Sequence, residues 1–374
     1  MKLECTKKLL DFLGEKPGIG VADPNADPLF SWTANLILLN RRKTIVITHA
    51  TSHATFVLYG ITAKDLRNIQ ELILEGMENL LKSMYVRREI IELYLRDCGR
   101  SVEFAANTSR SAVATCNKVC ERVQYLTNLF DPGDPFQKPY LKWLNDDMIP
   151  KEDYAYVTDF FLSLLRKKYG AEIQRCRAVE LEVTLELLAP CKRTLIVPAD
   201  LNFHQFHTIV QKAFGWSDCH LHQFVLENDS YGRPSKLIVP PNAEPFDYMD
   251  GTAPEYIDSS KITLEKVFSS YEYLQYKYDF GDSWTHHIKV KGFIDLCDNI
   301  HPHCTEAEGD APMEDSGGPY SFAEIMDILN QPDHPEYKDT QNWVRGTFWH
   351  PLDFNRINAE LKYYNPMPIP VYYG

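Results

Sequence analysis

The sequence lacks three features that would narrow its class at once: a long hydrophobic run, a CxxC pair and an internal repeat. Its first residues, MKLECTKKLLDFLG, mix charged with apolar side chains, so we expect neither a secretory signal nor a transmembrane helix and predict a cytoplasmic protein. The nine cysteines lie partly inside apolar segments, which indicates buried free thiols rather than a disulfide framework. The missing repeat excludes a solenoid.

Positive charge is also scarce in most of the chain. Residues 1–130 carry 17 Lys and Arg against 14 Asp and Glu, whereas residues 131–374 carry 22 against 38. Because Lys and Arg provide the non-specific affinity for phosphate backbones, the acidic part is not expected to bind nucleic acid without metal ions. In the first part, Arg41, Arg42 and Lys43 form a basic cluster, which is either a nucleic-acid contact or a solvated hairpin turn.

The length of 374 residues and the 44% hydrophobic content predict two domains, each able to bury a core. We place an N-terminal domain at residues 1–130, a linker with a bridging helix at residues 131–177 and a C-terminal domain at residues 178–374. The turn-rich sequence DPGDPFQKP marks the end of the first domain. The predicted fold class is α+β, and each domain is expected to hold a mixed or antiparallel sheet packed with helices.

Hydrophobic periodicity predicts the main elements of both domains. In the first domain and the linker, strands are expected at 32–39, 44–48 and 54–59, and helices at 61–84, 86–95, 112–129 and 154–169. In the second domain, strands are expected at 178–188, 192–198, 220–227 and 273–290, and helices at 321–329 and 352–363. A further helix is expected to begin at an N-cap, Asp200 or Asn202, and to end at Gly215.

Ligand-type side chains are concentrated between Asp279 and Asp315. This stretch contains nine carboxylates, four histidines and two cysteines, against Lys289 and Lys291 as its cations. Carboxylates at such a density repel one another unless cations or hydrogen bonds offset their charge. We therefore predict a metal site or a polar ligand site in the C-terminal domain.

Two histidines have a spacing that suits one metal ion. His220 and His222 lie two residues apart on one face of a predicted strand, so both imidazoles can reach the same ion. Asp279, Asp282 or His286 from a neighbouring strand would complete this site. Alternatively, His220 and His286 are core histidines whose ring nitrogens are satisfied by carbonyl or carboxylate groups.

Two glycine-containing segments carry further candidate ligands. In the FGD turn, Gly281 permits a positive φ or a bulge that would bring Asp279 and Asp282 together; alternatively, the carboxylates cap the turn through backbone N–H groups. In PMEDSGG, Glu314 and Asp315 precede two glycines, so this loop either holds an anion or anchors against the sheet. Oxygen ligands favour magnesium, manganese or calcium, and histidine favours zinc.

Four separated segments resemble one family. VPADLNFHQFHTIVQKAFGWSDCHLHQF, YDFGDSWTHHI, PHCTEAEGDAPMEDSGGPYSF and DFNRINAEL follow one another in the order and spacing of the plasmid pRiA4b ORF-3-like family, whose relatives include TnpR-type passenger proteins of insertion sequences. The resemblance covers about residues 178–363 and implies an α+β fold and an association with mobile elements, without a reaction. Residues 1–130 are similar to a small bacterial and phage domain of unknown function.

The family pattern is matched at His207, Trp216, Asp218, His220, Asp279, Gly281, Asp282, Trp284, His286, Cys304, Glu308, Pro312, Glu314, Asp315, Gly317, Gly318 and Asn358. It is not matched at four places. Ala307 stands where a Gly is usual, Gly309 stands where an Arg is usual, residues 191–193 lack the usual aromatic residue, and His350 replaces an acidic residue. The missing Arg leaves metal ions or protonated carboxylates as the counter-charge of the acidic run.

Three functions from different classes fit these observations. The first is an accessory or binding protein of a mobile-element family, which recognises a protein partner or small ligand in an acidic cleft; the cleft residues would be Trp216, Trp284, His207 and Glu308. The second is a DNA-binding regulator that uses the basic cluster at residues 41–43. No serine-recombinase pattern is visible, so strand exchange is not implied.

The third function is a divalent-metal-dependent hydrolase acting on phosphodiesters. Zinc, manganese or magnesium would be held by ligands drawn from Asp279, Asp282, His222, Glu314 and Asp315. His220 or His286 would serve as the general base. Whether the protein is an enzyme stays open at this point, because the same residues also describe a binding site.

Overall fold

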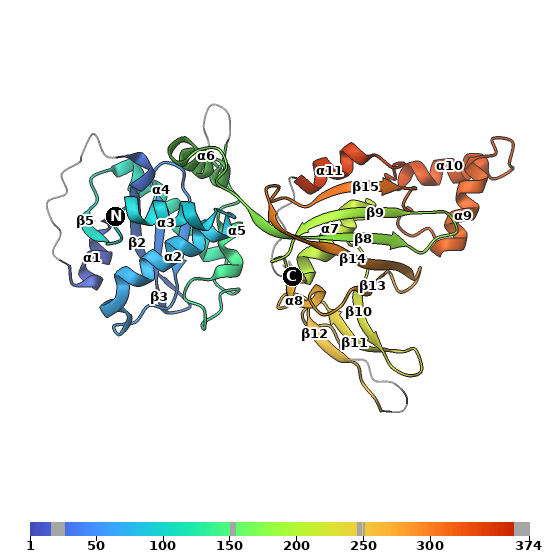
Figure 1. Cartoon of the computed structure of the whole chain (residues 1–374), viewed down its shortest axis with the longest axis horizontal. Coiled ribbons are helices and arrows are strands. Elements are labelled where there is room, and N and C mark those ends of the chain that lie inside the picture. The colour runs from blue at the N-terminus through green and yellow to red at the C-terminus, as the bar shows by residue number, and fades with distance from the viewer. Residues whose placement is uncertain (16–26, 150–154, 245–248, 250, 363–374) are drawn as a thin grey trace. The chain divides into compact units, whose positions relative to one another are not determined.

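A computed structural model of the chain describes residues 1–15, 27–149, 155–244, 249 and 251–362 (Figure 1). The chain divides into two compact units, Met1–Arg175 and Cys176–Gly374. Each unit contains a mixed β-sheet packed with helices, with five strands in the first unit and eight in the second. The predicted α+β class is therefore confirmed.

The sheet of the first unit has the order β4-β3-β2-β1-β5. Its strands are β1 (Lys2–Cys5), β2 (Trp32–Leu39), β3 (Arg42–His49), β4 (Thr55–Leu58) and β5 (Glu103–Ala106). The three predicted strands are confirmed as β2, β3 and β4. Strands β1 and β5, with four residues each, were not predicted. All four residues of β4 are buried, so both faces of the sheet are covered there.

The helices of the first unit are α1 (Lys7–Leu13), α2 (Ile69–Ser83), α3 (Arg88–Asp97), α4 (Arg110–Tyr125), α5 (Leu141–Leu144) and α6 (Val157–Tyr169). The predicted break between α2 and α3 is confirmed at Tyr85, where φ is 57°. Helix α2 begins later than predicted because Asp65 accepts hydrogen bonds from Thr62 and forms a turn before it. Tyr154, the first residue of the last predicted helix, lies outside the described residues.

Short elements complete the first unit. They are the 3₁₀ turns η1 (Pro28–Phe30), η2 (Asp65–Asn68) and η3 (Lys138–Tyr140), and the paired strands β6 (Met148–Ile149) and β7 (Ala155–Tyr156). The segment interpreted as a linker supplies Leu141, Phe161 and Leu165 to the core of this unit. Residues 131–175 therefore pack as part of the first unit.

The sheet of the second unit has the order β12-β11-β10-β13-β14-β8-β9-β15. Its strands are β8 (Cys176–Leu185), β9 (Lys192–Pro198), β10 (His222–Asn228), β11 (Pro234–Val239), β12 (Glu255–Asp258), β13 (Tyr273–Tyr278), β14 (Trp284–Cys297) and β15 (His303–Glu308). The predicted strand at 192–198 is β9. The stretch 273–290 contains two strands, β13 and β14, joined by the FGD turn.

Helix α7 (Phe203–Phe214) begins with a capping box, in which Asn202 and Gln205 exchange side-chain and backbone hydrogen bonds, and ends at Gly215 with φ 75°. Both predicted limits of this helix are confirmed. The other helices are α8 (Leu264–Phe268), α9 (Gly318–Leu329), α10 (Tyr337–Gly346) and α11 (Phe354–Lys362). Tyr363, the predicted last residue of α11, lies outside the described residues.

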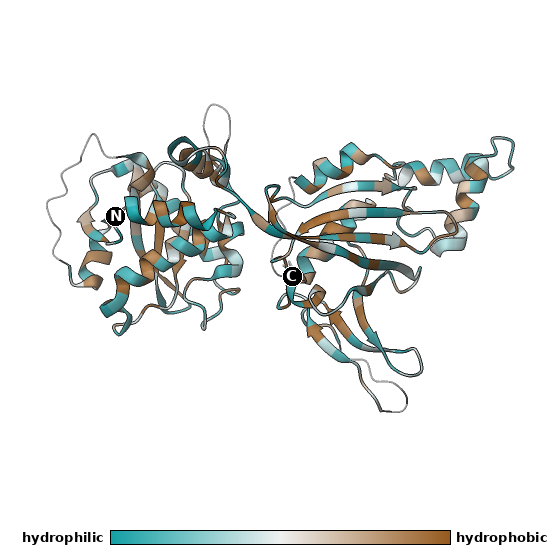
Figure 2. Cartoon of the chain, viewed as in Figure 1, coloured by the Kyte–Doolittle hydropathy of each residue, from teal (hydrophilic) through white to brown (hydrophobic). Residues whose placement is uncertain are grey.

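Apolar residues are frequent along the strands of each unit and alternate with hydrophilic residues along its helices (Figure 2). Each unit has its own hydrophobic core. In the second unit, Phe203 and Phe206 of α7 pack against Phe224 of β10. This packing fixes α7 on the sheet, and with it the loop that leads from α7 into β10. None of the helices in the described part of the chain is long and apolar enough to cross a membrane.

Candidate metal centre

Three connecting segments meet at one end of β10, β13 and β14. The start of β10 pairs with the end of β13 through His222 and Tyr278, and Tyr278 pairs with Trp284 at the start of β14. The backbone N–H of Asp279 donates to the carbonyl of Leu221 at 2.9 Å, which ties the FGD turn to the loop before β10. The loop before α9 joins them through Glu314. Ligand-type residues far apart in sequence are thereby brought together.

Three carboxylates surround one imidazole nitrogen at this end of the sheet. His220 Nε2 lies 3.7 Å from an oxygen of Asp279, 3.8 Å from an oxygen of Glu314 and 3.0 Å from an oxygen of Asp315. We name these four residues the His220 group. Although the oxygens are close, Nε2 is buried and makes no hydrogen bond with a described residue. The oxygens therefore lie beside the direction in which an N–H would point, not along it.

This arrangement has the spacing of a coordination sphere. Metal–ligand bonds of about 2.0–2.2 Å place neighbouring ligand atoms about 3.0–3.6 Å apart. In such a sphere the lone pair of each ligand atom points at the metal ion and not at the neighbouring ligand atom. The three distances from His220 Nε2 fall close to that range. Three carboxylates facing one imidazole also gather negative charge that a cation would offset.

Two carboxylates of the His220 group, those of Asp279 and Glu314, are oriented by hydrogen bonds. Asp279 Oδ1 accepts from the backbone N–H groups of Gly281 and Asp282, at 2.9 and 3.3 Å. Glu314 Oε1 accepts from the backbone N–H of Ser217 at 2.9 Å and from the hydroxyl of Tyr278 at 3.1 Å. Burial and the Glu314 carboxylate raise the pKa of Tyr278, so its hydroxyl remains a donor. Such supporting contacts are typical of metal ligands.

Two members of the group have a backbone conformation that is uncommon for residues other than glycine. Asp279 has φ 53° and Asp315 has φ 57°. From the sequence, Gly281 permitted a positive φ or a bulge, but the positive φ values of this turn lie at Asp279 and Ser283. Left-handed backbone at non-glycine residues gathers at functional sites, because the surrounding structure must hold it in place.

Asp282 lies outside the His220 group and anchors the loop that carries it. Its Oδ2 accepts from the backbone N–H of Gly317 at 2.8 Å. A second anchor is the hydrogen bond from Trp216 Nε1 to the carbonyl of Pro312, at 2.8 Å. Asp279 therefore caps the FGD turn with one oxygen, while Asp282 positions Glu314 and Asp315 from a distance. A glycine is needed at 318, because a Cβ there would lie 2.9 Å from the carbonyl oxygen of Asp282.

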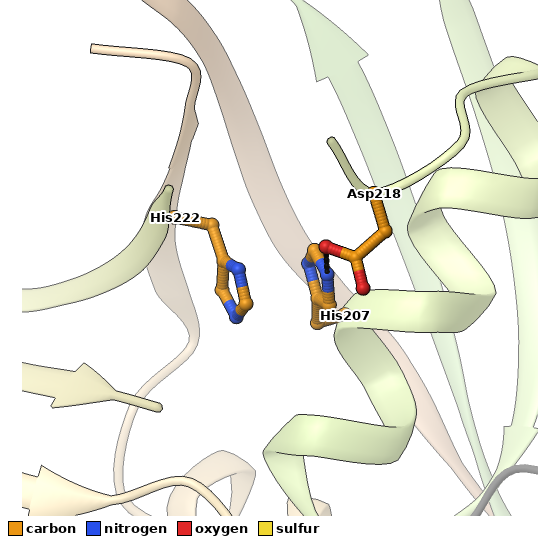
Figure 3. A group of neighbouring side chains, drawn as sticks. All are labelled: His207, Asp218 and His222. Carbon is orange, nitrogen blue, oxygen red and sulfur yellow. Dashed lines mark hydrogen bonds and ion pairs between the residues drawn. The ribbon is translucent and has the colours of Figure 1, made fainter. Parts of the chain in front are cut away.

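The structure separates His220 from His222, which we expected to share one ion. His220 precedes β10, and its ring joins the three carboxylates. His222 is the first residue of β10, and its ring stacks on His207 with centroids 3.4 Å apart (Figure 3). Asp218 lies beside His207. Among the described residues, two sets of three metal-ligand types have one ligand atom each within 4.8 Å of the others. The first is His220, Asp279 and Asp315, beside which Glu314 lies 3.8 Å from His220, and the second is His207, Asp218 and His222, which we name the His207 group.

His286, the second candidate base, lies inside the core of the second unit. Its ring is fully buried and packs against Phe214, Trp216 and Tyr276, with centroids 4.6, 5.2 and 5.2 Å away. Burial lowers the pKa of His286 to about 3. An imidazole with that pKa takes up a proton poorly near neutral pH, and this one is closed to solvent. His286 is therefore unsuited to the role of general base. It lies in the core, as the alternative interpretation held, but neither ring nitrogen has a hydrogen-bond partner among the described residues, so the expected carbonyl or carboxylate partner is not found.

Acid is expected to destabilise the second unit through His286. Unfolding restores the pKa from about 3 to 6.5, so the unfolded chain takes up a proton that the folded chain excludes, and stability falls as the pH falls below 6.5. From this residue alone, we expect the free energy of unfolding to be about 2 kcal/mol lower at pH 5 than at pH 7. In His286→Phe this share of the pH dependence should disappear, as measured by chemical denaturation at both pH values.

The exposed neighbour His287 provides the control for this measurement. His287→Gln removes an imidazole from the same strand but leaves the buried ring in place, so its pH dependence should equal that of the unmodified chain. If His286→Phe keeps the full difference between pH 7 and pH 5, burial of this ring is not the cause of the acid sensitivity.

The residues predicted to line a ligand cleft do not share an open surface. Trp216, Trp284 and His207 are 3%, 0% and 0% exposed, whereas Glu308 is exposed at the end of β15. The three buried rings contribute to the core instead. Aromatic residues next to ligand-type residues resemble a binding cleft in sequence, but here Trp216, in the loop after α7, and Trp284, at the start of β14, pack in the hydrophobic core.

The basic cluster of the first unit forms the turn between β2 and β3. Asn40 and Arg41 both have positive φ, 46° and 62°, as in a two-residue hairpin turn. The guanidinium of Arg42 lies 5.9 Å from the ring centroid of Tyr59, and Lys43 Nζ lies 4.0 Å from that of Phe12. Both cations thus contact aromatic rings of their own unit. This geometry agrees with the interpretation of a solvated hairpin turn.

The sequence analysis missed residues that support the His220 group. Tyr278 and Ser217 hold Glu314 in place, but neither is a ligand type. Tyr278 directly precedes Asp279 in the YDFGDSW motif, and this position next to a candidate ligand could have indicated its supporting role. The role of Ser217 could not be predicted from its residue type, because its backbone N–H makes the shorter contact with Glu314 and any residue other than proline provides that group.

The second unit is an α+β domain that gathers histidine and carboxylate side chains at one end of its central strands. Residues 177–358 belong to the plasmid pRiA4b ORF-3-like family, which confirms the resemblance found in the sequence. Residues 2–159 match a domain of unknown function, DUF6933. Two units with separate family matches agree with the division of the chain after Arg175.

Two similar proteins have names that state no activity. An uncharacterised protein, y4hQ, from Sinorhizobium fredii (strain NBRC 101917 / NGR234) is 30% identical over 168 residues, which is 44% of this chain and 79% of that protein. The crystal structure of a protein of unknown function, MM3350 from Methanosarcina mazei Go1, is 26% identical, with a TM-score of 0.40; the match covers 48% of this chain and 96% of that one.

Proposed function

We propose that the second unit binds a divalent cation through the His220 group and that the protein is an accessory binding protein, which recognises an anionic partner or small ligand through this ion. The observation that carries the proposal is the position of His220 Nε2. It is buried, makes no hydrogen bond with a described residue and lies within ion-pair distance, 3.0–3.8 Å, of three carboxylates. One nitrogen and three oxygens suit manganese, magnesium or zinc.

The exposure of Asp315 supports a role in binding beyond the ion itself. Its side chain is 74% exposed, whereas those of Asp279 and Glu314 are 12% and 19% exposed. An ion held here therefore faces solvent on the Asp315 side and keeps coordination positions for a further ligand. An anionic group of a partner can occupy them despite the acidic charge of this unit.

Replacement of Asp315 is the sharpest test of the proposed site. Asp315→Asn removes one charged ligand at an exposed position, so the fold should be retained. We expect the dissociation constant for Mn²⁺, measured by electron paramagnetic resonance of the free ion, to rise about 10–100-fold. Glu314→Gln should have a similar effect, because it alters a ligand without changing the shape of the side chain.

Glu308→Gln is the matched control for this experiment, because it removes one negative charge from an exposed position outside the group. Its Mn²⁺ affinity should equal that of the unmodified chain. The proposal fails if the unmodified chain does not bind Mn²⁺, or if Asp315→Asn and Glu308→Gln bind the ion equally well.

Metal-dependent hydrolysis of phosphodiesters is a second candidate function, which the open side of the group supports. A divalent ion lowers the pKa of a bound water, and the exposed side gives water and substrate access to it. In this case His220 acts as a ligand rather than as the base. Hydrolysis of bis(p-nitrophenyl) phosphate that requires Mn²⁺ and disappears in Asp315→Asn would establish this function. Mn²⁺ binding without hydrolysis would leave the accessory binding function and reject the hydrolase.

A further inference from the structure

The His207 group contains a buried imidazole that lacks a hydrogen bond. His222 is 9% exposed, and its Nε2 has no partner among the described residues. Its ring lies parallel to that of His207, with 6° between the planes, and Asp218 Oδ1 is 2.7 Å from His207 Nε2 (Figure 3). One ligand atom from each of the three residues lies within 4.8 Å of the others. The group is separate from the proposed His220 site.

A hydrogen-bond network fixes the direction of His207. Its Nδ1 lies 2.7 Å from the hydroxyl of Tyr276, which also accepts from Gln211 Nε2 at 2.9 Å. Gln211 Oε1 in turn accepts from the backbone N–H of Asp218 at 2.9 Å. His207 Nε2 is therefore held toward the Asp218 carboxylate. Support of one ring nitrogen by a hydrogen bond is what orients a histidine toward a metal ion through the other nitrogen.

The free nitrogens around this network are available as metal ligands. His222 Nε2 is buried and has no hydrogen-bond partner among the described residues, so no protein donor occupies its lone pair. His204 lies one turn before His207 on α7, and its Nδ1 is also buried without a partner. Neutral imidazole is the form that coordinates metals. Asp218 is 45% exposed and adds a negative charge at the solvent side.

We propose that the His207 group is a second cation site, for a transition metal such as Zn²⁺ or Co²⁺. Two imidazoles and one carboxylate favour these ions over Mg²⁺, whereas the His220 group is rich in oxygen. The ion binds the lone pair of His207 Nε2 in the tautomer that carries the ring proton on Nδ1, where the hydroxyl oxygen of Tyr276 accepts it, so the ring stays neutral and no net proton leaves the site. Lone pairs lie in the ring planes, so two parallel rings cannot both point at one ion. His222 therefore turns out of the stack when the ion binds.

Cobalt binding to the full chain tests this site, because Co²⁺ bound to nitrogen and oxygen ligands absorbs visible light. The titration is done with Asp315→Asn, in which the His220 group is impaired. We expect one equivalent of Co²⁺ to bind and to produce a visible absorption band. In Asp315→Asn chains that also carry Asp218→Asn or His222→Gln, affinity should fall about tenfold or more and the band should weaken.

Matched variants keep the two metal proposals distinct. His287→Gln removes an exposed histidine outside both groups and should leave Co²⁺ binding unchanged. Because Asp218 is largely at the surface, Asp218→Asn should remain folded and decides the result if His222→Gln unfolds, as judged by circular dichroism. The second site is rejected if Asp315→Asn binds no Co²⁺, or if Asp218→Asn leaves binding unchanged. Either result is independent of Mn²⁺ binding at the His220 group.

Discussion

Gly309→Ala is expected to lower the free energy of unfolding of the second unit by about 3–5 kcal/mol. Gly309 follows β15 and has φ 71°, a conformation that disfavours any residue with a Cβ. A Cβ at this position would also lie 1.8 Å from the carbonyl oxygen of Pro190 and 2.9 Å from its carbonyl carbon. Both atoms belong to the backbone, so no side chain can rotate to relieve the contact. The turn between β8 and β9 would have to move away from β15.

Chemical denaturation measures this effect, and hydrogen exchange of the β9 and β15 amides locates it in the second unit. Gly292→Ala is the matched control, because Gly292 in β14 lacks positive φ and a Cβ there would meet nothing within 4 Å. We expect it to change the free energy of unfolding by less than about 1 kcal/mol. Equal stability of the two variants would show that the chain around Pro190 adapts without strain.

Arg193→Met is expected to destabilise the second unit by a comparable amount, about 3–5 kcal/mol. Arg193 on β9 is 2% exposed, and its guanidinium donates to the carbonyl oxygens of Ala213, Glu308 and Gly309 at 2.8–3.1 Å. Replacing a buried ion pair by apolar residues is often harmless, because both charges leave together. Here the acceptors are backbone carbonyls, which stay buried and lose their donor. Because burying these carbonyls without a donor costs free energy, Arg193→Met is expected to destabilise the unit rather than stabilise it.

Lys192→Met is the control for Arg193→Met, since it removes a cation from the adjacent position of the same strand. Lys192 is only partly buried, and its Nζ lies 3.8 Å from Glu182, an ion pair expected to contribute about 0–1 kcal/mol. Arg193→Lys should fall between the two variants, because one ammonium group cannot reach all of these carbonyls. If Arg193→Met unfolds at the same denaturant concentration as Lys192→Met, the carbonyls find other donors, and Arg193 does not stabilise the unit through them.

The role of Gly309 could not be predicted from the sequence. We interpreted the glycine as the loss of an arginine beside the acidic run, and therefore as a question of charge. In the structure the residue is needed for its backbone, which passes against Pro190 and offers its carbonyl to Arg193. An interaction between β15, β9 and the turn before β9 joins residues more than 100 positions apart, and no local pattern records it.

The candidate sites show the same limit. Alternation along a strand placed His220 and His222 on one face, but β10 begins only at His222, so the rule does not extend to His220. The same rule could not show that Asp282 faces Gly317, because the turn takes its positive φ at Asp279 and Ser283 rather than at Gly281. Local residue types indicated which side chains can bind metal. Backbone conformation at a few residues decided how they are grouped.

From the sequence by itself came the α+β class, most long helices and strands, the limits of α7, the family of the C-terminal part and the candidate ligands His220, Asp279, Glu314 and Asp315. These follow from hydrophobic periodicity, caps and residue types, which act over a few neighbouring positions. Only the tertiary structure decided which ligands meet, that His286 and both tryptophans are buried, and that His222 stacks on His207. Those outcomes depend on strand order and register, which are set by packing between segments distant in the chain.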